Sequence, residues 1–174
     1  IVSCSSFIPL KRVHLIIEIL KHLPFQVKWT HFGDGPLRDE IHALAKELPE
    51  NVQTDFKGFV ANDAVIDFYK NEPIDLFMNV SELEGIPVSI MEAISFGIPS
   101  TGCQVCGVPE IVTKETGFLF EKKINIEDAV RQISIYKNMS KNEKLTFLKG
   151  VKIFWKKKFD ADVNYSTFIA ENLQ

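Results

Sequence analysis

Short apolar runs alternate along the chain with longer segments in which apolar residues recur at helical spacing. Between residues 10 and 23, for example, Val13, Ile16 and Leu20 fall on one face of a helix. Strand-like runs that alternate with such helices are typical of βαβ units around a parallel sheet. The predicted strands cover residues 1–6, 25–32, 52–59, 74–80, 98–102 and 117–120, and the predicted helices cover residues 10–23, 36–48, 63–71, 87–96, 108–113 and the chain from about 126 to the end.

The run at 74–80 is almost continuously apolar, as in a strand that is covered on both faces. Asn62 or Asp63 is suited to cap the helix that follows it. The pattern predicts one α/β domain over residues 1–174, with a Rossmann-like, doubly wound parallel sheet and helices on both faces. Ligands of such sheets bind beyond the carboxyl ends of the strands, at a switch point in strand order.

The segment SELEGIPVSIMEAISFGIPS, residues 81–100, carries the most informative chemistry. Pro87 fits the first turn of a helix, where its missing N–H would have no partner. The amides from Val88 to Ile90 then point out of the helix start as free donors. Together with the helix dipole they predict an anion site suited to phosphate, and Gly85 lets a ligand approach the backbone closely.

Two glutamates flank this helix start, eight positions apart. Glu84 precedes the helix, and Glu92 lies about one and a half turns into it, on a polar stripe with Ser89 and Ser95. A carboxylate on so apolar a helix needs a hydrogen-bonding partner or water. A ligand with hydroxyls at both ends and a diphosphate between them would explain both residues. In the alternative interpretation Glu84 is a loop charge and Glu92 faces solvent.

Composition and charge narrow the function classes. The chain is 45% hydrophobic with a net charge of −3, and its densest basic cluster, WKKKF at 155–159, is interpreted as a solvated helix face and not as a nucleic-acid patch. No apolar run approaches the roughly 18–20 residues of a membrane span. The N-terminal residues lack the layout of a signal peptide and begin on a strand, so we expect a fragment of a longer chain.

The cysteines and histidines suggest no metal centre. The three cysteines favour a reducing compartment over a disulfide framework. Cys103 and Cys106 form a C-x-x-C pair without a second pair or a flanking histidine, so two small residues in a tight turn are favoured over a zinc site or a redox dithiol. His31 ends a strand beside the Gly33–Gly35 turn, where it either touches a ligand or packs in the core.

At this point the sequence resembles the retaining glycosyltransferases of family 4, which have the GT-B fold. The segment from Glu84 to Glu92 resembles the E-x7-E signature of that family. Four further segments resemble family motifs in the same order: FIPLKRVHLIIEIL (7–20), HFGDGPLRDEI (31–41), FKGFV (56–60) and GVPEIV with TGFLF (107–112 and 116–120). The resemblance implies the C-terminal, donor-binding half of a two-domain enzyme, in which residues 160–174 form a helix that packs on the missing N-terminal domain.

The resemblance also implies roles for individual residues. Glu84 would hydrogen-bond hydroxyls of the transferred sugar, Glu92 would bind the ribose hydroxyls, and Lys11 would pair with the diphosphate and offset the charge of the leaving group. Glu84 and Lys11 are thus the expected catalytic pair. The remaining donor-binding residues that the resemblance implies are Ser6, Gly33, Gly35, Phe59, Val60, Gly85, Ile86, Pro87, Val88 and Ser89.

Two departures affect the expected phosphate clamp and the loop that faces the sugar. Ser6 stands where the family usually has an arginine, which removes one phosphate cation. Residues 104–107, Gln-Val-Cys-Gly, stand in place of the usual Asp-x-Gly-Gly.

The function implied by the resemblance is retaining transfer of a hexosyl group from a nucleotide-diphosphate sugar to a glycan or lipid-linked acceptor. No metal or other cofactor is implied, and the isolated fragment should bind donor without transferring it. The implied location is the cytoplasm, with peripheral attachment of the full-length protein to the inner face of the membrane left open. The alternatives are a non-catalytic α/β nucleotide- or protein-binding module, in which the glutamates are surface charges, and an epimerase or phosphorylase of GT-B architecture.

Overall fold

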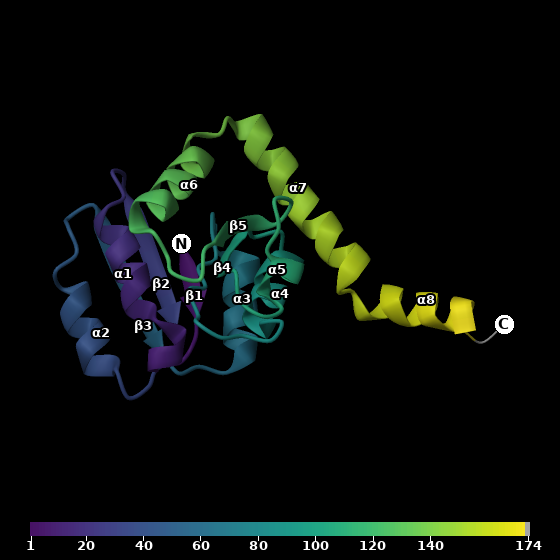
Figure 1. The fold of residues 1–174 in the computed structure, drawn as a ribbon, viewed down its shortest axis with the longest axis horizontal. Coiled ribbons are helices and arrows are strands. Elements are labelled where there is room, and N and C mark those ends of the chain that lie inside the picture. Colours follow the sequence, from purple (N-terminus) through teal and green to yellow (C-terminus); the bar gives the residue numbers. More distant parts are fainter. Residues whose placement is uncertain (173–174) are drawn as a thin grey trace.

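A computed structural model describes residues 1–172 as an α/β fold with parallel strands between helices (Figure 1). The strands are β1 (Val2–Cys4), β2 (Val27–Phe32), β3 (Val52–Gly58), β4 (Ser100–Cys103) and β5 (Gly117–Phe120). The helices are η1 (Pro9–Lys11), α1 (Val13–Lys21), α2 (Arg38–Ala45), α3 (Asn62–Asn71), α4 (Val88–Ser95), α5 (Val108–Ile111), α6 (Ile126–Asn138), α7 (Lys141–Lys158) and α8 (Ala161–Asn172).

Every strand pairing in the described chain is parallel. β2 pairs with both β1 and β3, while β4 pairs with β5. Phe77 joins the two groups because it forms one parallel bridge to Val2 and another to Ser100. Counting the segment at Phe77 as the fourth strand gives the order 3-2-1-4-5-6, which is the order of a doubly wound sheet. The predicted fold class is therefore confirmed.

The predicted strand at 74–80 is wrong in its extent. Only Phe77 has strand pairing, through two backbone hydrogen bonds on each side. Beyond it the chain turns toward the site, where the Asn79 side chain accepts a hydrogen bond from the Ser81 amide. The segment is nonetheless buried from Leu76 to Ser81, as the apolar run indicated.

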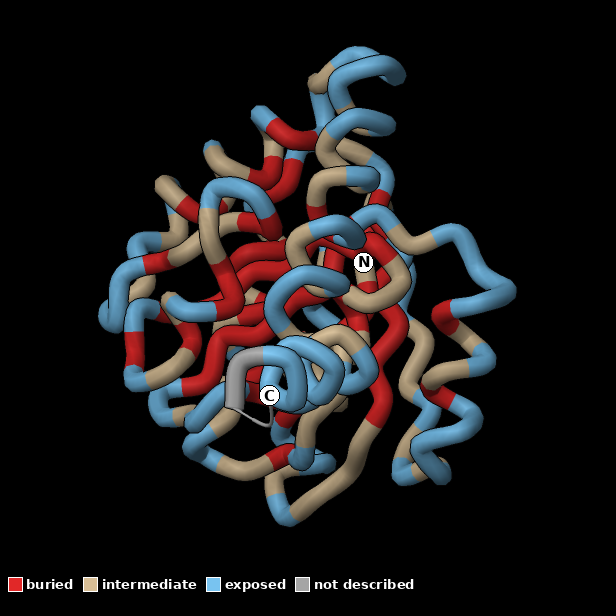
Figure 2. The backbone as a smooth tube through the Cα atoms, turned by 90° about the vertical axis from the view of Figure 1, so that its right-hand side faces the viewer, coloured by how far each residue is buried: buried red, intermediate tan, exposed pale blue. Residues whose placement is uncertain are grey.

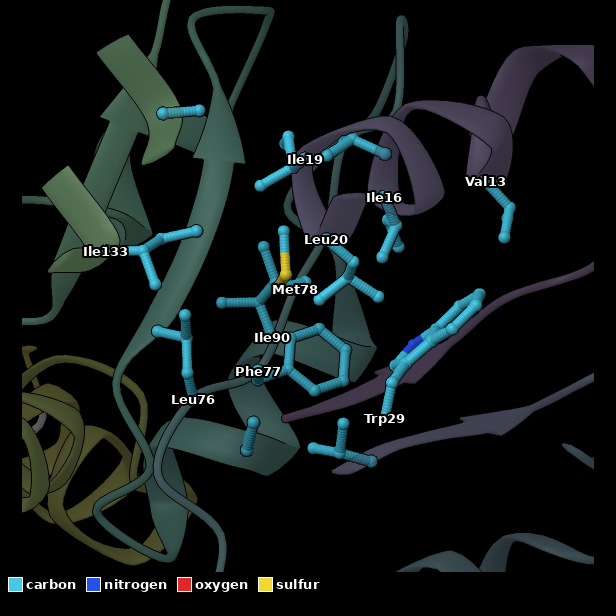
Figure 3. Close-up of a cluster of buried hydrophobic side chains, with 14 of the residues drawn as sticks. Val13, Ile16, Ile19, Leu20, Trp29, Leu76, Phe77, Met78, Ile90 and Ile133 are labelled. Carbon is cyan, nitrogen blue, oxygen red and sulfur yellow. The ribbon is translucent and has the colours of Figure 1, made fainter. Parts of the chain in front are cut away.

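Helices cover both faces of the sheet. In Figure 1, α1 and α2 lie to the left of the strands and α3, α4 and α5 to the right. α6 packs against α1, and α7 packs against α4. The helices and strands meet in a core whose buried side chains include Ile16 and Leu20 of α1, Trp29 of β2 and Ile90 of α4 (Figure 3).

The chain is helical from residue 126 onward, as predicted, over the described residues. This part of the chain consists of α6, α7 and α8, with breaks at residues 139–140 and 159–160. The first break is fixed by a capping box, because the Ser140 side chain accepts from the Glu143 amide and the Glu143 carboxylate accepts from the Ser140 amide. The Ser-x-x-Glu signature of this capping box is present in the sequence at residues 140–143. The helical pattern on both sides of it gave no indication of a break between two helices.

α8 lies away from the strands at the end of α7, and its surface is mostly exposed (Figures 1 and 2). Of the predicted C-terminal segment 160–174, residues 173–174 lie outside the described part of the chain. The predicted packing of this segment on another domain stays a prediction. Over residues 1–172, no helix combines the length and the apolar character that a membrane crossing requires.

His31 belongs to the core, so of the two interpretations offered for it, packing is confirmed. It is fully buried and stacks on Phe7 with ring centroids 4.6 Å apart. The Trp29 indole N–H donates to Ser3 Oγ at 2.8 Å, and Ser3 Oγ lies 2.7 Å from His31 Nδ1. On the other side His31 Nε2 lies 3.0 Å from the Ser5 carbonyl oxygen. Since a carbonyl only accepts, Nε2 carries the proton and Nδ1 accepts from the Ser3 hydroxyl.

This arrangement should make folding stability depend on pH. Burial lowers the pKa of His31 from 6.5 to about 4. The unfolded chain therefore binds a proton between these values that the folded chain excludes, and the free energy of unfolding should fall by roughly 3 kcal/mol as the pH drops from 6.5 to 4. Urea unfolding at successive pH values measures the slope. The His31→Gln protein should show a flatter profile, whereas substitution of the exposed His14 by glutamine should leave it unchanged; an equally steep profile for His31→Gln would exclude this histidine as the cause.

Candidate functional site

Two loops beyond the carboxyl ends of the strands form the candidate site. The first follows β1 and runs through η1, and the second follows the Phe77 segment and runs into α4. These two segments are parallel neighbours in the sheet, but the strand after β1 (β2) is added on one side and the strand after Phe77 (β4) on the other, so their loops border the switch point. The Glu82 amide donates to the Leu10 carbonyl oxygen at 2.9 Å and joins the loops. The structure thus brings together residues that lie more than 70 positions apart.

Lys11 and Glu84 meet at this point. The Lys11 Nζ atom lies 2.6 Å from Glu84 Oε1, and the two side chains are 23% and 13% exposed. Burial acts to raise the pKa of Glu84, but hydrogen bonds from Lys11, Ser81 and Asn79 outweigh it and hold the pKa below its ordinary value. Glu84 is therefore ionised at neutral pH and available to accept hydrogen bonds.

Asn79 is a polar residue of the site that the sequence did not reveal as functional. Its side-chain nitrogen donates to Glu84 Oε1 at 3.3 Å, and its side-chain oxygen accepts from the Ser81 amide at 2.9 Å. Asn79 is buried, so these bonds fix the loop before Glu84. The feature of the sequence that could have pointed to Asn79 is its single side-chain amide within the apolar run at 74–80.

The start of α4 offers free backbone donors, although with a different first turn from the one predicted. Pro87 is the N-cap and not the first helical residue, and its carbonyl accepts from the amides of Ile90 and Met91. Within residues 1–172, the amides of Val88 and Ser89 donate to no protein acceptor. Val88 is 60% exposed, so an anion can reach the helix start. The donor set is therefore two amides, because the amide of Ile90 is already paired.

Glu92 lies on the side of α4 that faces α3. The Asn62 side-chain nitrogen donates to Glu92 Oε1 at 2.7 Å, which supplies the hydrogen-bonding partner that a carboxylate on this helix requires. The predicted capping role of Asn62 or Asp63 is wrong, because Ala61 is the N-cap of α3 and no side chain caps it. Asn62 is close enough to reach Glu92, a contact between distant segments that a local pattern cannot show.

A separate hollow of about 180 Å³ adjoins the carboxyl ends of β1, β2 and β3. It is lined by Ser6, Gly33, Phe59 and Val60, four of the predicted donor-binding residues, together with Cys4, Ser5, Phe32, Asp34 and Val65. Phe59 is 89% exposed, which is unusual for a phenylalanine and leaves its ring available to a ligand.

Gly33 and Gly35 shape the rim of this hollow by letting backbones approach. A Cβ atom on Gly33 would lie 2.0 Å from the Ser5 carbonyl oxygen, and its φ is +130°. A Cβ on Gly35 would lie 2.7 Å from the Phe7 carbonyl oxygen. Both glycines are thus needed to pack the β2–α2 turn against the loop that leads to Lys11, which is a structural role beside any contact with a ligand.

The segment at residues 104–107 lies against the loop that leads into α4. A Cβ on Gly107 would lie 2.9 Å from the Gly85 carbonyl oxygen and 2.9 Å from Ile86 Cγ1. Cys106 is exposed with φ +42°, whereas Cys103 is buried. The two cysteines therefore have different environments. Among residues 1–172 there is no group of three His, Cys, Asp or Glu side chains that could hold a metal ion.

Residues 1–146 match the family described as Glycosyl transferases group 1, and the chain belongs to that family. It is 28% identical over 127 residues to the sulfoquinovosyl transferase SQD2 of Arabidopsis thaliana, covering 71% of this chain and 23% of that protein. It is 30% identical over 124 residues to the N-acetyl-alpha-D-glucosaminyl L-malate synthase of Bacillus anthracis, covering 70% of this chain and 32% of that protein. The chain thus spans about a quarter to a third of the length of these relatives.

Among solved structures, HepE of Anabaena in complex with UDP superposes with a TM-score of 0.75 and 25% identity. The alignment covers 99% of this chain and 48% of HepE. Further structures of HepE contain UDP with glucose, and UDP-glucose. The fold is that of a GT-B glycosyltransferase domain.

Proposed function

We propose that this chain is the donor-binding domain of a retaining glycosyltransferase of family 4. The full-length protein would transfer a hexosyl group from a nucleotide-diphosphate sugar to a glycan or lipid-linked acceptor. The observation that carries the proposal is the ion pair of Lys11 and Glu84, 2.6 Å apart at the switch point, beside a helix start with free amides. The acceptor would bind a further, N-terminal domain, and residues 160–174 would pack on that domain.

The diphosphate would rest against the amides of Val88 and Ser89. The Lys11 ammonium carries three donors, so it can remain paired with Glu84 while it binds a phosphate oxygen. Charge develops on the leaving nucleoside diphosphate in the transition state, and the helix dipole and Lys11 would stabilise it there. With Ser6 in place of an arginine, Lys11 carries more of this role.

Glu84 would accept hydrogen bonds from hydroxyls of the transferred sugar and orient it, a positioning role and not that of a general base. Gly85, Ile86 and Pro87 would form the wall beside the sugar. A Cβ on Gly85 would meet no atom within 4 Å, so the open space next to this glycine is free for a ligand. Glu84 is ionised in its pair with Lys11, and an ionised carboxylate only accepts hydrogen bonds. It can therefore accept from the hydroxyls of a sugar.

The nucleoside would extend from the diphosphate toward α3. Asn62 occupies one oxygen of Glu92 and leaves the other for the ribose hydroxyls. The hollow beside Phe59 and Val60 would receive the base. That the solved relative HepE binds UDP and UDP-glucose supports a nucleotide-sugar donor of this kind.

The proposed reaction proceeds with retention at the anomeric carbon and without a metal ion. The proposed location is the cytoplasm or its membrane surface, where nucleotide sugars would meet a growing glycan. The stereochemistry of the transferred sugar, followed by proton NMR on the full-length protein, tests the assignment. A product of inverted configuration would remove the chain from the retaining class.

A thermal-shift panel tests donor binding directly. Ligands that bind only the folded state raise the melting temperature, so we expect a rise with at least one of UDP, GDP, ADP or CMP and their sugar conjugates. The Glu92→Gln protein should lose most of the rise with every nucleotide, because a charged carboxylate oxygen that accepts from the ribose is replaced by an amide group. The Glu84→Gln protein should keep the rise with the free nucleotide and lose the added rise with the sugar conjugate. No shift with any compound at millimolar concentration would favour a module that does not bind nucleotides.

A further inference from the structure

Arg12, which directly follows Lys11, adopts a backbone conformation that side chains rarely take. Its φ and ψ are +48° and +37°, in the left-handed helical region, and it is the N-cap of α1. Among the described residues, only Cys106 is a second non-glycine residue with positive φ. Such a conformation costs free energy for an L residue and persists only when the surroundings enforce it. A glycine would adopt it without strain, so the arginine side chain itself needs an explanation.

The guanidinium group of Arg12 bridges three segments. Its Nε donates to the Val80 carbonyl oxygen at 2.8 Å, and Nη2 donates to the Ser81 carbonyl oxygen at 3.3 Å. Nη1 donates to the Lys122 carbonyl oxygen at 3.0 Å, beyond β5, and Nη2 also contacts Cys103 Sγ at 3.2 Å, at the end of β4. All three nitrogens thus donate to protein atoms, and these four contacts hold the guanidinium to the protein.

These contacts connect the two halves of the candidate site. Val80 and Ser81 lie four and three residues before Glu84, and Lys11 is the neighbour of Arg12 in the chain. The planar guanidinium presents its donors in a rigid fork, so it fixes the direction of the loop as well as its distance. A lysine ammonium at the end of a flexible stem could satisfy only part of this set.

We propose that Arg12 is a positioning residue that holds the Lys11 and Glu84 segments in register for a nucleotide-sugar donor. Arg12 acts through the backbone of both loops and touches neither the sugar nor the phosphates. The inference rests on the proposed donor-binding function. It adds a determinant of sugar recognition to the residues that face the ligand.

The test compares the dissociation constants of UDP and UDP-glucose by calorimetric titration, for the 174-residue chain and its variants. The Arg12→Gly protein removes the guanidinium and relieves the backbone strain. We expect UDP-glucose to bind it about tenfold more weakly and UDP no more than about threefold more weakly, so that the preference for the sugar conjugate falls. The Arg12→Lys protein, which keeps the charge, should lose preference in the same direction. Substitution of the exposed Arg131 by glutamine controls for the loss of one positive charge and should change neither constant.

A second measurement separates positioning from a general loss of stability. Titration of the Glu84 carboxyl carbon by NMR should show its pKa moving up toward the ordinary value in Arg12→Gly, because Lys11 no longer stays paired with it. An unchanged Glu84 pKa together with an unchanged UDP-glucose preference in Arg12→Gly overturns the inference and leaves the proposed function intact. A wild-type chain that binds neither UDP nor UDP-glucose, tested beside GDP and ADP conjugates that also fail to bind, overturns the proposed function itself.

Discussion

Replacing Lys11 by methionine should weaken the binding of UDP and of UDP-glucose by about ten- to a hundredfold. The estimate follows from the loss of one charge-assisted hydrogen bond to phosphate. Methionine keeps much of the apolar stem, so packing changes little. The variant also leaves Glu84, with a 13% exposed side chain, without its cation. We expect the pKa of Glu84 to rise, and calorimetry with carboxyl-carbon NMR measures both effects.

The chain offers a matched control for this substitution at the far end of α1. Lys21 pairs with Glu47 at 3.3 Å, and its side chain is 26% exposed, close to the value for Lys11. Lys21→Met removes the same charge from the opposite end of α1, whose start follows Lys11, but should leave nucleotide affinity unchanged. A double-mutant cycle of Lys11→Met and Glu84→Gln then measures their coupling in donor binding. Wild-type affinity in the Lys11→Met protein would refute the role assigned to this lysine.

Replacing Gly33 by alanine should destabilise the fold by about 3–5 kcal/mol. The added Cβ would lie 2.0 Å from the Ser5 carbonyl oxygen, and that atom belongs to the backbone, so it cannot swing aside. The positive φ of +130° adds strain that an L side chain cannot relieve. Destabilisation of this size comes from a short list of mechanisms, and strain at an unusual backbone conformation is one of them. Urea unfolding, with the slope checked for constancy, gives the value.

Two other glycines serve as controls because a Cβ on either meets no atom within 4 Å. Gly150 lies within α7, so Gly150→Ala should stabilise the chain by about 0.5–1 kcal/mol through helix propensity. Gly85→Ala should change stability by less than about 0.5 kcal/mol. If Gly33→Ala unfolded at the same urea concentration as Gly85→Ala, the close packing of the β2–α2 turn on the β1 loop would be wrong.

The parts of the fold that the sequence predicts are those governed by local periodicity. Apolar runs located all five strands to within a few residues, and the helical spacing located α1, α3 and α4. The helix predicted at 36–48 begins at Arg38 and ends at Ala45, because residues 36–37 and 46–48 form turns. Such boundary shifts are expected, since terminal turns depend on caps that a periodic pattern does not record.

The parts that could not be predicted depend on contacts between distant segments. Asn62 looked like a helix cap because its local context suits one, but its side chain bonds Glu92, thirty residues away. Arg12 falls within the helix predicted at 10–23, yet it precedes α1 and its guanidinium reaches Val80 and Lys122. The approach of Lys11 to Glu84 likewise depends on the order of strands in the sheet. The sequence alone suggested their proximity through the family resemblance, and not through spacing.

The narrow link at Phe77 has a consequence for how this domain would hold a donor. Two backbone hydrogen bonds join the Phe77 segment to β1 and two join it to β4, so this short segment is the strand that links the half with β1–β3 to the half with β4 and β5. Lys11 belongs to the first half and α4 to the second. A ligand that contacts both Lys11 and α4 would link the two halves of the sheet. Ligand binding and the association of the two halves would therefore stabilise each other.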